Sequence, residues 1–472
     1  MPKYTTSVIP ARETADKVRE SFLDWLAAED NDRQARYRAY REYYDGQHDT
    51  QLTERQRKYL QVKIGEEFNA NFCPIVVNAL AERLTVTGFD AEDGELLWEW
   101  WDTSRMDAVQ GIVHTAAVRD GDTYLIVEWD NERDRPCFIS ELAYDGAEGV
   151  KVHYSPEKRG VIDFASKRWR VNQGPDSGYQ RRMNLYYPDR IEKYVSDQRL
   201  FEGAWQPYHK EGELWPIPWL ASDGAPLGVP VVHFKNGDEG YNYGQSEIRD
   251  IIPIQNALNK TTIDLLATAD TTAFRIYYMI GDDPSSLTLT PGSWVYSKRP
   301  PGGDNGAAIG AIDPADLRPL LDLKDAFTIQ IAQISRTPIS YFQASGQRPA
   351  EGTLKQEESG LVAKARNRQV TFGNSWEDAM NIARRLAATY GEGAADDDEP
   401  ISAQWRDPET RNEKEHLEAL GIKRTQLGVP LEQLWLEAGY TPEQIENMRD
   451  SDEHQARVGL MRLGFGGEGQ GG

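Results

Sequence analysis

Apolar residues recur at three- and four-residue steps in two long segments of the second half of the chain. The first segment predicts a helix with one apolar face, which stops before Thr337-Pro338 because the residue preceding a proline is pushed out of the α region. That face consists of Leu320, Leu323, Phe327, Ile331 and Ile334. The second segment predicts a much longer helix with a kink at Gly373-Asn374-Ser375. Its apolar positions are Leu361, Ala365, Phe372, Trp376, Met380, Ala383 and Tyr390.

The residues between these two helices have no periodic apolar face. From Ser345 to Gly352 they are small or polar, with glycines and a proline among them. Such a segment is typical of an exposed loop. Held between two anchored helices, it could present backbone groups and a few donors to a passing ligand.

Residues 13–120 read as a series of helices. One apolar face begins at Phe22, Trp25 and Leu26 and continues at helical spacing with Tyr37, Tyr40 and Tyr44, until Asp45-Gly46 ends it. Thr53 and Gln56 form a capping-box pattern. Pro74 suits a first helical position, and Gly88 is expected to close that helix. A further helix, with Val109, Ile112, Val113, Ala116 and Ala117 on its apolar face, is expected to end near Gly121.

Between Thr123 and Lys235 the pattern becomes strand-like. Short runs rich in β-branched and aromatic residues alternate with turn residues: TYLIVEW, PCFIS, VKVHY, GVIDF, RWRV, MNLYY, RIEKYV and PVVHF. They predict a mostly antiparallel sheet. The region is locally basic through Lys158, Arg159, Lys167, Arg168, Arg170, Arg181 and Arg182. Nucleic-acid binding is one interpretation, but solvated strand faces are favoured because no stacking aromatics interleave at a known module's spacing.

The segment from Ser246 to about Thr268 predicts a second strut-like helix, interrupted by Pro253. The insert between the struts is expected to hold two strands, Phe274–Ile280 and Ser293–Ser297, and the irregular loop PPGGDNGAAIG. Beyond Tyr390, the charged run GEGAADDDEP predicts a linker and GFGGEGQGG a disordered tail. Short helices are expected at 412–420, 431–438 and 442–449, with a last one toward 463.

Composition limits the function classes. The chain has 472 residues, of which 53 are basic and 76 acidic, giving a net charge of −23. This length favours two or more cores, or one elongated subunit, and the charge has the wrong sign for a protein that wraps nucleic acid. Two cysteines, Cys73 and Cys137, are too few for a disulfide framework. Because no run approaches 18 apolar residues, we expect no membrane insertion.

A search for catalytic and metal-binding patterns finds little. Gly346 and Gly352 have five residues between them instead of the four of a phosphate-binding loop. The seven histidines are scattered, without HExxH or paired Cys/His spacing. Asp189 and Glu192 faintly resemble a nuclease signature, but they lie too close in sequence for the usual strand-turn-strand arrangement. We therefore expect no enzymatic activity, no cofactor and no metal.

Three stretches, in order, resemble one family. They are YREYYDGQHDTQL with NFCPIVVNALAERLTVTGF, then YGQSEIRDIIPIQNALNKTTIDLLATAD, then RTPISYFQASGQRPAEGTLKQEESGLVAKARNRQVTFGNSWEDAM. Together they are similar to the portal proteins of tailed bacteriophages, most of all those of long-tailed phages of actinobacteria. The resemblance implies an α+β fold: the phage portal fold with an α-helical stem, a long kinked helix and crown, a mixed α/β wing and a small β-containing clip.

The resemblance also implies a division of the chain. The expected parts are a wing at 1–240, helical to about 120 and β-rich over 121–240, stem helices at 241–272 and 316–344, a clip at 273–315, a tunnel loop at 345–358, the long kinked helix at 359–392, and a crown with a disordered tail at 393–472. The residues implied to line the DNA channel are Ser345, Gly346, Gln347, Arg348, Pro349, Glu351, Gly352, Thr353 and Lys355.

In function, the resemblance implies a ring of twelve copies at one capsid vertex, through which double-stranded DNA is packaged and ejected. Implied partners are large terminase, then a head-tail adaptor, with the major capsid and scaffolding proteins around the ring. The implied location is the virion, after assembly in the host cytoplasm. Two alternatives stay open: a structural head or scaffolding protein that conducts no DNA, and a metal-dependent DNA-processing enzyme. Arg348 and Lys355 could touch phosphates or pair with Glu351 and Glu357 of a neighbouring copy.

Overall fold

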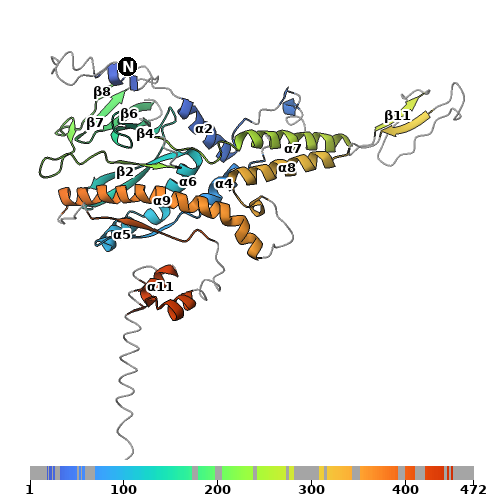
Figure 1. Cartoon of the computed structure of the whole chain (residues 1–472). Helices are drawn as coiled ribbons and strands as arrows, with labels where there is room; N and C mark the ends of the chain where they lie inside the picture. The colour runs from blue at the N-terminus through green and yellow to red at the C-terminus, as the bar shows by residue number, and fades with distance from the viewer. Residues whose placement is uncertain are drawn as a thin grey trace, which may run out of the picture. The chain divides into compact units, whose positions relative to one another are not determined.

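The structure is a computed structural model, shown in Figure 1. It describes residues 19, 21–23, 25–26, 32–49, 53–54, 56–58, 70–172, 179–196, 205–237, 242–272, 276–280, 308–312, 316–342, 351–391, 399–409, 420–438, 440, 444–445 and 448–449. The mixture of helices and mostly antiparallel sheets in this part of the chain confirms the expected α+β class.

The chain forms two compact units, each built from separate stretches of sequence. Unit 1 comprises Met1–Gln34, Ala79–Gln245 and Pro349–Gly472, and unit 2 comprises Ala35–Asn78 and Ser246–Arg348. The expected N-terminal part, 1–240, is therefore divided between both units. Residues 35–78 belong with the expected stem and clip, which a reading of the chain in sequence order did not anticipate.

Unit 1 contains a three-stranded antiparallel sheet of order β10-β2-β3. Its central strand β2 (Asp122–Asp130) pairs with β3 (Arg135–Leu142) on one side and β10 (Val231–Lys235) on the other. Helix α6 (Met106–Asp120) leads directly into β2, and Gly121 ends it in a left-handed conformation, as expected. Figure 1 shows α9 (Glu351–Tyr390) running along this sheet.

A second sheet in unit 1 has the order β4-β5-β6-β7-β8, with β9 (Ile217–Pro218) also paired to β7. Its strands are β4 (Gly149–Tyr154), β5 (Ile162–Asn172), β6 (Tyr179–Tyr186), β7 (Arg190–Ser196) and β8 (Gln206–Pro207). The last three residues of the run GVIDF and the whole run RWRV, expected as two strands, lie in the single strand β5. The N-terminal residues Leu23 and Leu26 are buried in one cluster with Met183, Leu185 and Tyr194.

The helical prediction for residues 13–120 is wrong at one place. Helix α4 (Cys73–Ala81) ends seven residues before Gly88, which lies inside β1 (Val86–Asp90). This strand pairs with β13 (Ser402–Trp405), also unexpected, in a two-stranded antiparallel sheet. Helix α5 (Gly94–Thr103) follows it. Two strands of four or five residues, about 300 positions apart, give too weak a periodic signal for recognition by pattern.

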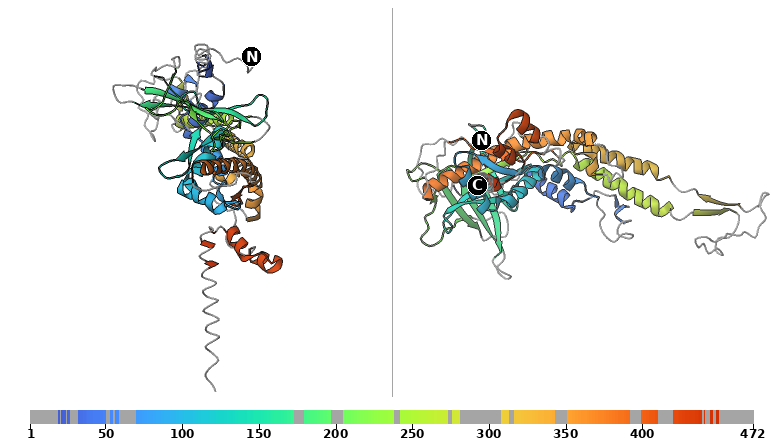
Figure 2. Two further views of the ribbon diagram at one scale, coloured as in Figure 1. Left: turned by 90° about the vertical axis from the view of Figure 1, so that its left-hand side faces the viewer. Right: turned by 90° about the horizontal axis from the view of Figure 1, so that it is seen from below.

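Unit 2 is built around two long helices, α7 (Ile252–Thr272) and α8 (Arg318–Ser335). Figure 1 and the right panel of Figure 2 show them side by side, with the antiparallel pair β11 (Ile276–Ile280) and β12 (Ala308–Ile312) beyond their ends. Most of α2 (Asp32–Asp45) also belongs to this unit. The arrangement agrees with two struts that carry a β-containing insert.

Two details of unit 2 differ from expectation. Pro253 does not interrupt α7, because the helix begins at Ile252 and proline is tolerated in the first turn, where its missing N–H has no intrahelical partner. In the insert, the strand that pairs with β11 is β12, in the stretch we expected as irregular loop. The expected strand Ser293–Ser297 lies outside the described residues.

The capping box at Thr53 and Gln56 is confirmed. The Thr53 backbone N–H donates to the Gln56 Oε1 at 3.0 Å, and the Gln56 backbone N–H donates back to the Thr53 Oγ1 at 3.4 Å. Near the C-terminus, α11 (Leu431–Glu437) matches the helix expected at 431–438, and a π-helical turn, Lys423–Leu427, precedes it. The helix expected at 412–420 lies almost wholly outside the described residues.

Candidate functional site

The expected channel residues fall at the start of α9 or just before it. Ser345, Gly346, Gln347, Arg348 and Pro349 lie outside the described residues. Helix α9 begins at Glu351, so the stretch 351–358, which we expected in the loop, is helical.

Glu351, Gly352, Thr353 and Lys355 therefore occupy the first turns of this helix. Gly352 misled the prediction, since a glycine costs only about 1 kcal/mol relative to alanine inside a helix. An acidic residue at the first position also suits the positive end of the helix dipole. The predicted loop at 345–358 is therefore too long, because its last eight residues, 351–358, are helical.

Only part of the predicted apolar face of helix α8 is buried. The helix ends at Ser335, with Arg336 in a left-handed conformation, directly before Thr337-Pro338 as expected. Of the predicted face, Ile331 is fully buried, whereas Leu323 is 42% exposed and Ile334 49% exposed.

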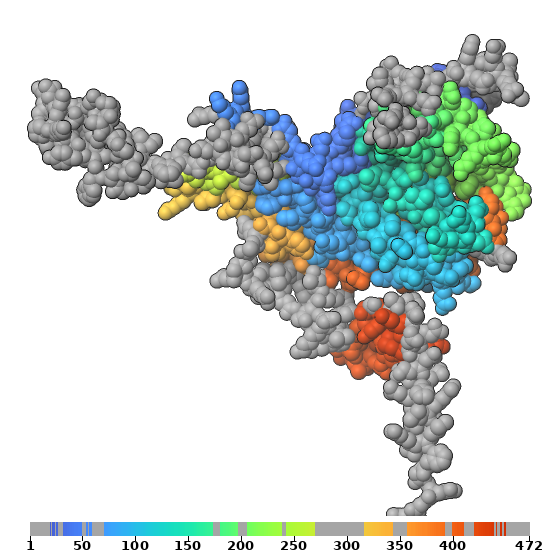
Figure 3. Space-filling view, turned by 180° about the vertical axis from the view of Figure 1, so that it is seen from behind, coloured from blue at the N-terminus to red at the C-terminus, as the bar shows by residue number. Residues whose placement is uncertain are grey.

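These two exposed residues are 11 positions apart, which is close to three helical turns and places them on one side of α8. Phe327 lies between them and is half-buried. We call Leu323, Phe327 and Ile334 the α8 flank. In Figure 3 the yellow residues of α8 reach the surface of the helix pair. Such a flank of large apolar side chains is a candidate surface for contact with another chain.

Helix α7, which we expected to be the other stem helix, is fixed by buried amides. Gln255 and Asn259 are both fully buried and lie one turn apart. The Gln255 Oε1 accepts a hydrogen bond from the Phe72 backbone N–H at 3.0 Å, and the Asn259 Oδ1 accepts one from the Ala70 N–H at 3.1 Å. Because buried backbone donors must be paired, these amides hold α7 in one register against residues 70–72.

Helix α9 is the central core helix of unit 1. Gly373 and Ser375, expected to kink it, lie within continuous helix, and the bend visible in Figure 1 is nearer its N-terminal end. A Cβ added at Gly373 would lie 3.3 Å from the Trp405 Nε1. The glycine therefore does not kink the helix but leaves room for the close approach of β13. The Ser375 hydroxyl donates to the His233 carbonyl at 2.9 Å and thereby ties α9 to β10.

A buried histidine anchors the middle of α9. The Trp376 Nε1–H donates to the His114 Nε2 at 3.0 Å, and the His114 Nδ1 lies 3.0 Å from the Leu84 carbonyl oxygen. The imidazole must therefore carry its proton on Nδ1 and be neutral. Burial lowers the pKa of His114 to about 4, which agrees with this neutral state.

The lowered pKa predicts acid sensitivity of unit 1. The pKa of His114 is about 4 in the folded state and about 6.5 in the unfolded state, so protonation favours the unfolded chain. The full stability of the fold is therefore present above pH 6.5 and is lost as the pH falls toward 4. For His114 the loss is at most about 3 kcal/mol. Urea unfolding from pH 7.5 to 4.5 should show falling midpoints, with a flatter slope in His114→Phe.

Some slope should remain in that variant, because burial likewise lowers the pKa of His153, to about 3. The same substitution at the exposed His209 serves as control and should leave the slope unchanged. Equal slopes in wild type and His114→Phe would contradict the assignment of acid sensitivity to His114.

The C-terminal half of α9 carries an ion pair whose arginine is buried. The fully buried Arg384 forms a bidentate contact with the Asp93 carboxylate and donates to the Glu399 carbonyl oxygen at 2.7 Å. Arg368, nearer the N-terminal end, donates to the Asn236 Oδ1 at 2.6 Å. Helix α9 is thus fixed at several points along its length.

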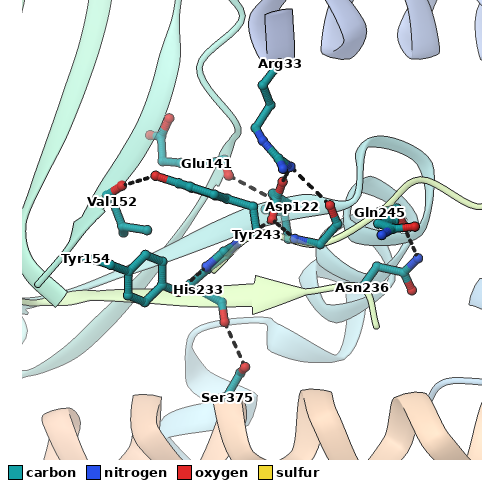
Figure 4. A network of polar contacts seen from close by, with 12 residues as sticks. Arg33, Asp122, Glu141, Val152, Tyr154, His233, Asn236, Tyr243, Gln245 and Ser375 are labelled. Atoms are coloured by element: carbon teal, nitrogen blue, oxygen red, sulfur yellow. Dashed lines mark hydrogen bonds and ion pairs between the residues drawn. The ribbon is translucent and has the colours of Figure 1, made fainter. Parts of the chain in front are cut away.

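A network of polar groups surrounds Asp122, as Figure 4 shows. Asp122 is fully buried, and its Oδ1 accepts hydrogen bonds from the His233 Nε2 at 2.8 Å and the Gly244 backbone N–H at 2.7 Å. Its Oδ2 accepts one from the Arg33 Nη1 at 2.9 Å. The other His233 nitrogen, Nδ1, lies 2.6 Å from the Tyr154 hydroxyl. Asp122 is the acceptor that joins these donors.

The network lies where the chain passes from one unit to the other. Arg33 comes just before the passage at Gln34, and Gly244 just before the passage at Gln245. Arg33 also donates to the Gly244 carbonyl at 3.1 Å. A Cβ at Gly244 would lie 2.0 Å from the Gly121 carbonyl oxygen, so only glycine fits this position. Asp122 therefore fixes the chain close to two of the points where it leaves unit 1. The pattern of apolar residues in the sequence did not indicate this role.

Other candidates from the sequence prove structural. The aromatic residues Tyr37, Tyr40 and Trp101 are at most 7% exposed, so they belong to the core and offer no surface for contacts between copies. Of the proposed nuclease pair, the Asp189 Oδ1 and the Glu192 Oε1 both accept hydrogen bonds from Arg190, at 3.0 and 2.8 Å. The other Glu192 oxygen accepts from the Tyr194 hydroxyl at 2.7 Å.

Within the described ranges, no three His, Cys, Asp or Glu side chains gather closely enough to hold a metal ion. None of the helices in the same part of the chain is long and apolar enough to cross a membrane. Both Cys73 and Cys137 are free thiols, and burial raises the pKa of Cys73 to about 12. That thiol is therefore an unreactive core residue.

Two curated proteins are similar to this chain over most of its length. The curated portal protein of Mycobacterium phage D29 is 25% identical over 410 residues, covering 83% of this chain and 80% of the relative. That of Mycobacterium phage L5 is 25% identical over 414 residues, with the same coverage. A solved structure, the neck of a native GTA particle computed with C12 symmetry, is similar over 82% of this chain at 12% identity and a TM-score of 0.41.

The family model described as "Phage portal protein, SPP1 Gp6-like" matches residues 23–457, which is nearly the whole chain. This match includes both long helices of unit 2, the sheets of unit 1 and α9. The chain therefore belongs to the phage portal protein family.

Proposed function

We propose that this portal protein assembles into a closed ring of twelve copies around a channel for double-stranded DNA. The observation that carries the proposal is the α8 flank, because Leu323 and Ile334 remain exposed on a helix that buries Thr328, Ile331, Ala332 and Ser335. A ring needs head-to-tail interfaces that close after a fixed rotation, and a half-covered stem helix offers one side of such an interface. The neighbouring copy's stem would supply the other side.

The channel lining is the segment between α8 and α9. Ser345, Gly346, Gln347, Arg348 and Pro349 precede α9, and Glu351, Gly352, Thr353 and Lys355 begin it. In the proposal these residues face the DNA, and Arg348 and Lys355 make weak phosphate contacts. The net charge of −23 per chain supports a conduit, since a strongly basic bore would retain DNA through counterion release.

In this role the ring occupies one capsid vertex in the virion, and assembly takes place in the host cytoplasm. Large terminase docks on the clip during packaging, and a head-tail adaptor replaces it. Major capsid and scaffolding proteins surround the wing. The work of translocation comes from the separate ATPase, and the portal supplies the passage without catalysis or cofactor.

The structural-protein alternative differs in one testable respect, the passage of DNA. Deleting Gln347–Ala350 removes residues before α9 while leaving the helix intact from Glu351. Rings should form with unchanged symmetry in electron micrographs, because changes to such a loop rarely reach a core. The amount of DNA packaged or retained should fall to a small fraction of wild type.

A Gly-Ser segment of equal length in place of Gln347–Ala350 separates the effect of length from that of side chains. It should restore packaging if only the reach of the loop matters, and restore it in part if Arg348 contributes. Normal packaging by the deletion variant would remove the loop from the mechanism. Intact rings without any central opening would favour the non-conducting structural protein.

A further inference from the structure

The basic stretch of the β4–β8 sheet contains a buried arginine that has no role in the proposed channel. Arg168, on β5, was expected on a solvated strand face. Instead it is 5% exposed, and its Nε, Nη1 and Nη2 atoms all lack a hydrogen-bond partner. Burying a cation in this way is strongly unfavourable, and a native protein almost always compensates such a group with a counter-charge or an ion.

Among the residues that the structure describes, no carboxylate accepts a hydrogen bond from Arg168. Its guanidinium carbon lies 4.4 Å from the centre of the Tyr144 ring, and the Tyr144 hydroxyl donates to the Gly146 carbonyl at 3.0 Å instead of facing the arginine. A ring face attracts a cation, but the gain is about 2 kcal/mol at best, far less than an ion pair needs to supply in a buried site.

Arg168 lines a small pocket with other cations. Its lining includes three arginines, Arg168, Arg181 and Arg182, and three aromatic residues, Tyr144, Trp169 and Trp205. The Arg182 Nη1 is also buried without a hydrogen-bond partner. No carboxylate contributes to the described lining.

The positive charges in this part of the sheet lower the pKa values of neighbouring basic groups. Burial, together with the charges of Lys151 and Arg168, lowers the pKa of the neighbouring His153 to about 3, so this imidazole is neutral and adds no charge of its own. Burial and the charge of Arg170 likewise lower the pKa of Arg181. The local field therefore favours an anion.

The size of the pocket restricts the ligand. Its volume is about 20 Å³, and about 10–15 Å³ suffices for one water-sized particle. A nucleotide or a peptide cannot enter such a space. We propose that this pocket is an anion-binding site that holds one chloride-sized ion against the guanidinium of Arg168, and that the bound ion stabilises the β4–β8 sheet.

The direct test is the line width of the ³⁵Cl NMR signal as purified full-length protein is added. Wild type should broaden the line, and bromide should reverse the broadening. Arg168→Met, which keeps an unbranched apolar stem and removes the guanidinium with its charge, should abolish the broadening. The matched control, Lys158→Met, removes one positive charge from the exposed β4–β5 turn and should behave like wild type.

Thermal unfolding gives a second measurement. Chloride is varied against gluconate, an anion too large for the pocket, at constant ionic strength. The wild-type midpoint should rise by about 3 °C between chloride concentrations near Kd and 100-fold above it. The Arg168→Met midpoint should not depend on chloride and should be at least equal to that of wild type at low chloride, because an uncompensated buried charge has been removed.

If Arg168→Met does not fold, Arg182→Met tests the same pocket. Chloride broadening that persists in a folded Arg168→Met variant would overturn the proposal. So would wild-type protein that neither broadens the chloride line nor gains stability from chloride.

Discussion

Replacing Leu323 and Ile334 together by glutamate is expected to leave the single chain folded and to prevent ring assembly. Both side chains are more than 40% exposed in the isolated chain, so the substitutions should change its unfolding free energy by only about 0.5 kcal/mol each. In a ring the α8 flank would be covered by the next copy. The new carboxylates would then be buried without partners, which costs several kcal/mol at every interface.

A loss of about 3 kcal/mol per interface corresponds to more than a hundredfold weaker association at each contact. Size-exclusion chromatography with light scattering should therefore show monomers where wild type shows rings. Leu214→Glu with Val161→Glu is the matched control, since it adds the same charge at exposed apolar residues of unit 1. Rings of normal size from the α8 double variant would exclude this flank as the interface.

The two long helices, α8 and α9, were predictable because their apolar residues repeat over many turns. The end of α8 was predictable as well, since proline restricts the residue before it. The start of α9 was not, because Gly352 and the polar residues around it give no apolar face. Helix position there depends on intrinsic propensity and dipole effects, which a periodic pattern does not record.

Structural features that depend on residues far away in the sequence could not be predicted from the pattern of apolar and polar residues. Strand β1 exists because β13 pairs with it from the other end of the sequence, and neither is long enough to show alternation. Arg168 reads as one more solvated cation in a basic stretch, and only packing reveals that its guanidinium is buried. The α8 flank is an intermediate case: the sequence predicts the apolar face, and the structure shows which part of it α7 leaves uncovered.

Asp122 is the clearest example of a residue whose role depends on such contacts, and its replacement should have the largest effect on stability. Asp122→Ala leaves the His233 Nε2–H, the Gly244 N–H and Arg33 without their shared acceptor. Removing one partner of a buried charged network typically costs about 3–5 kcal/mol. Urea unfolding should show this loss, whereas Asp102→Ala, at an exposed position on α5, should cost about 0.5 kcal/mol or less.

Asp122→Asn distinguishes charge from shape. Its amide retains one oxygen acceptor but cannot accept from all three donors, so we expect a smaller cost of about 1–3 kcal/mol. In this variant amide hydrogen exchange at Gly244 should accelerate, because the N–H loses a charged acceptor. A double-mutant cycle with Arg33→Met should then give a coupling energy above about 0.5 kcal/mol.

These measurements bear on the proposed channel as well as on stability. Both Arg33 and Gly244 lie next to passages of the chain into unit 2, which contains α7 and α8, the proposed stem helices. If Asp122 holds these passages, Asp122→Asn should reduce ring formation at temperatures where unit 1 is still folded. If Asp122→Asn assembles like wild type and Asp122→Ala loses less than about 1 kcal/mol, the network is only one of many dispersed contacts. In that case the contacts within unit 2, above all those that Gln255 and Asn259 make with residues 70–72, are the ones that fix α7.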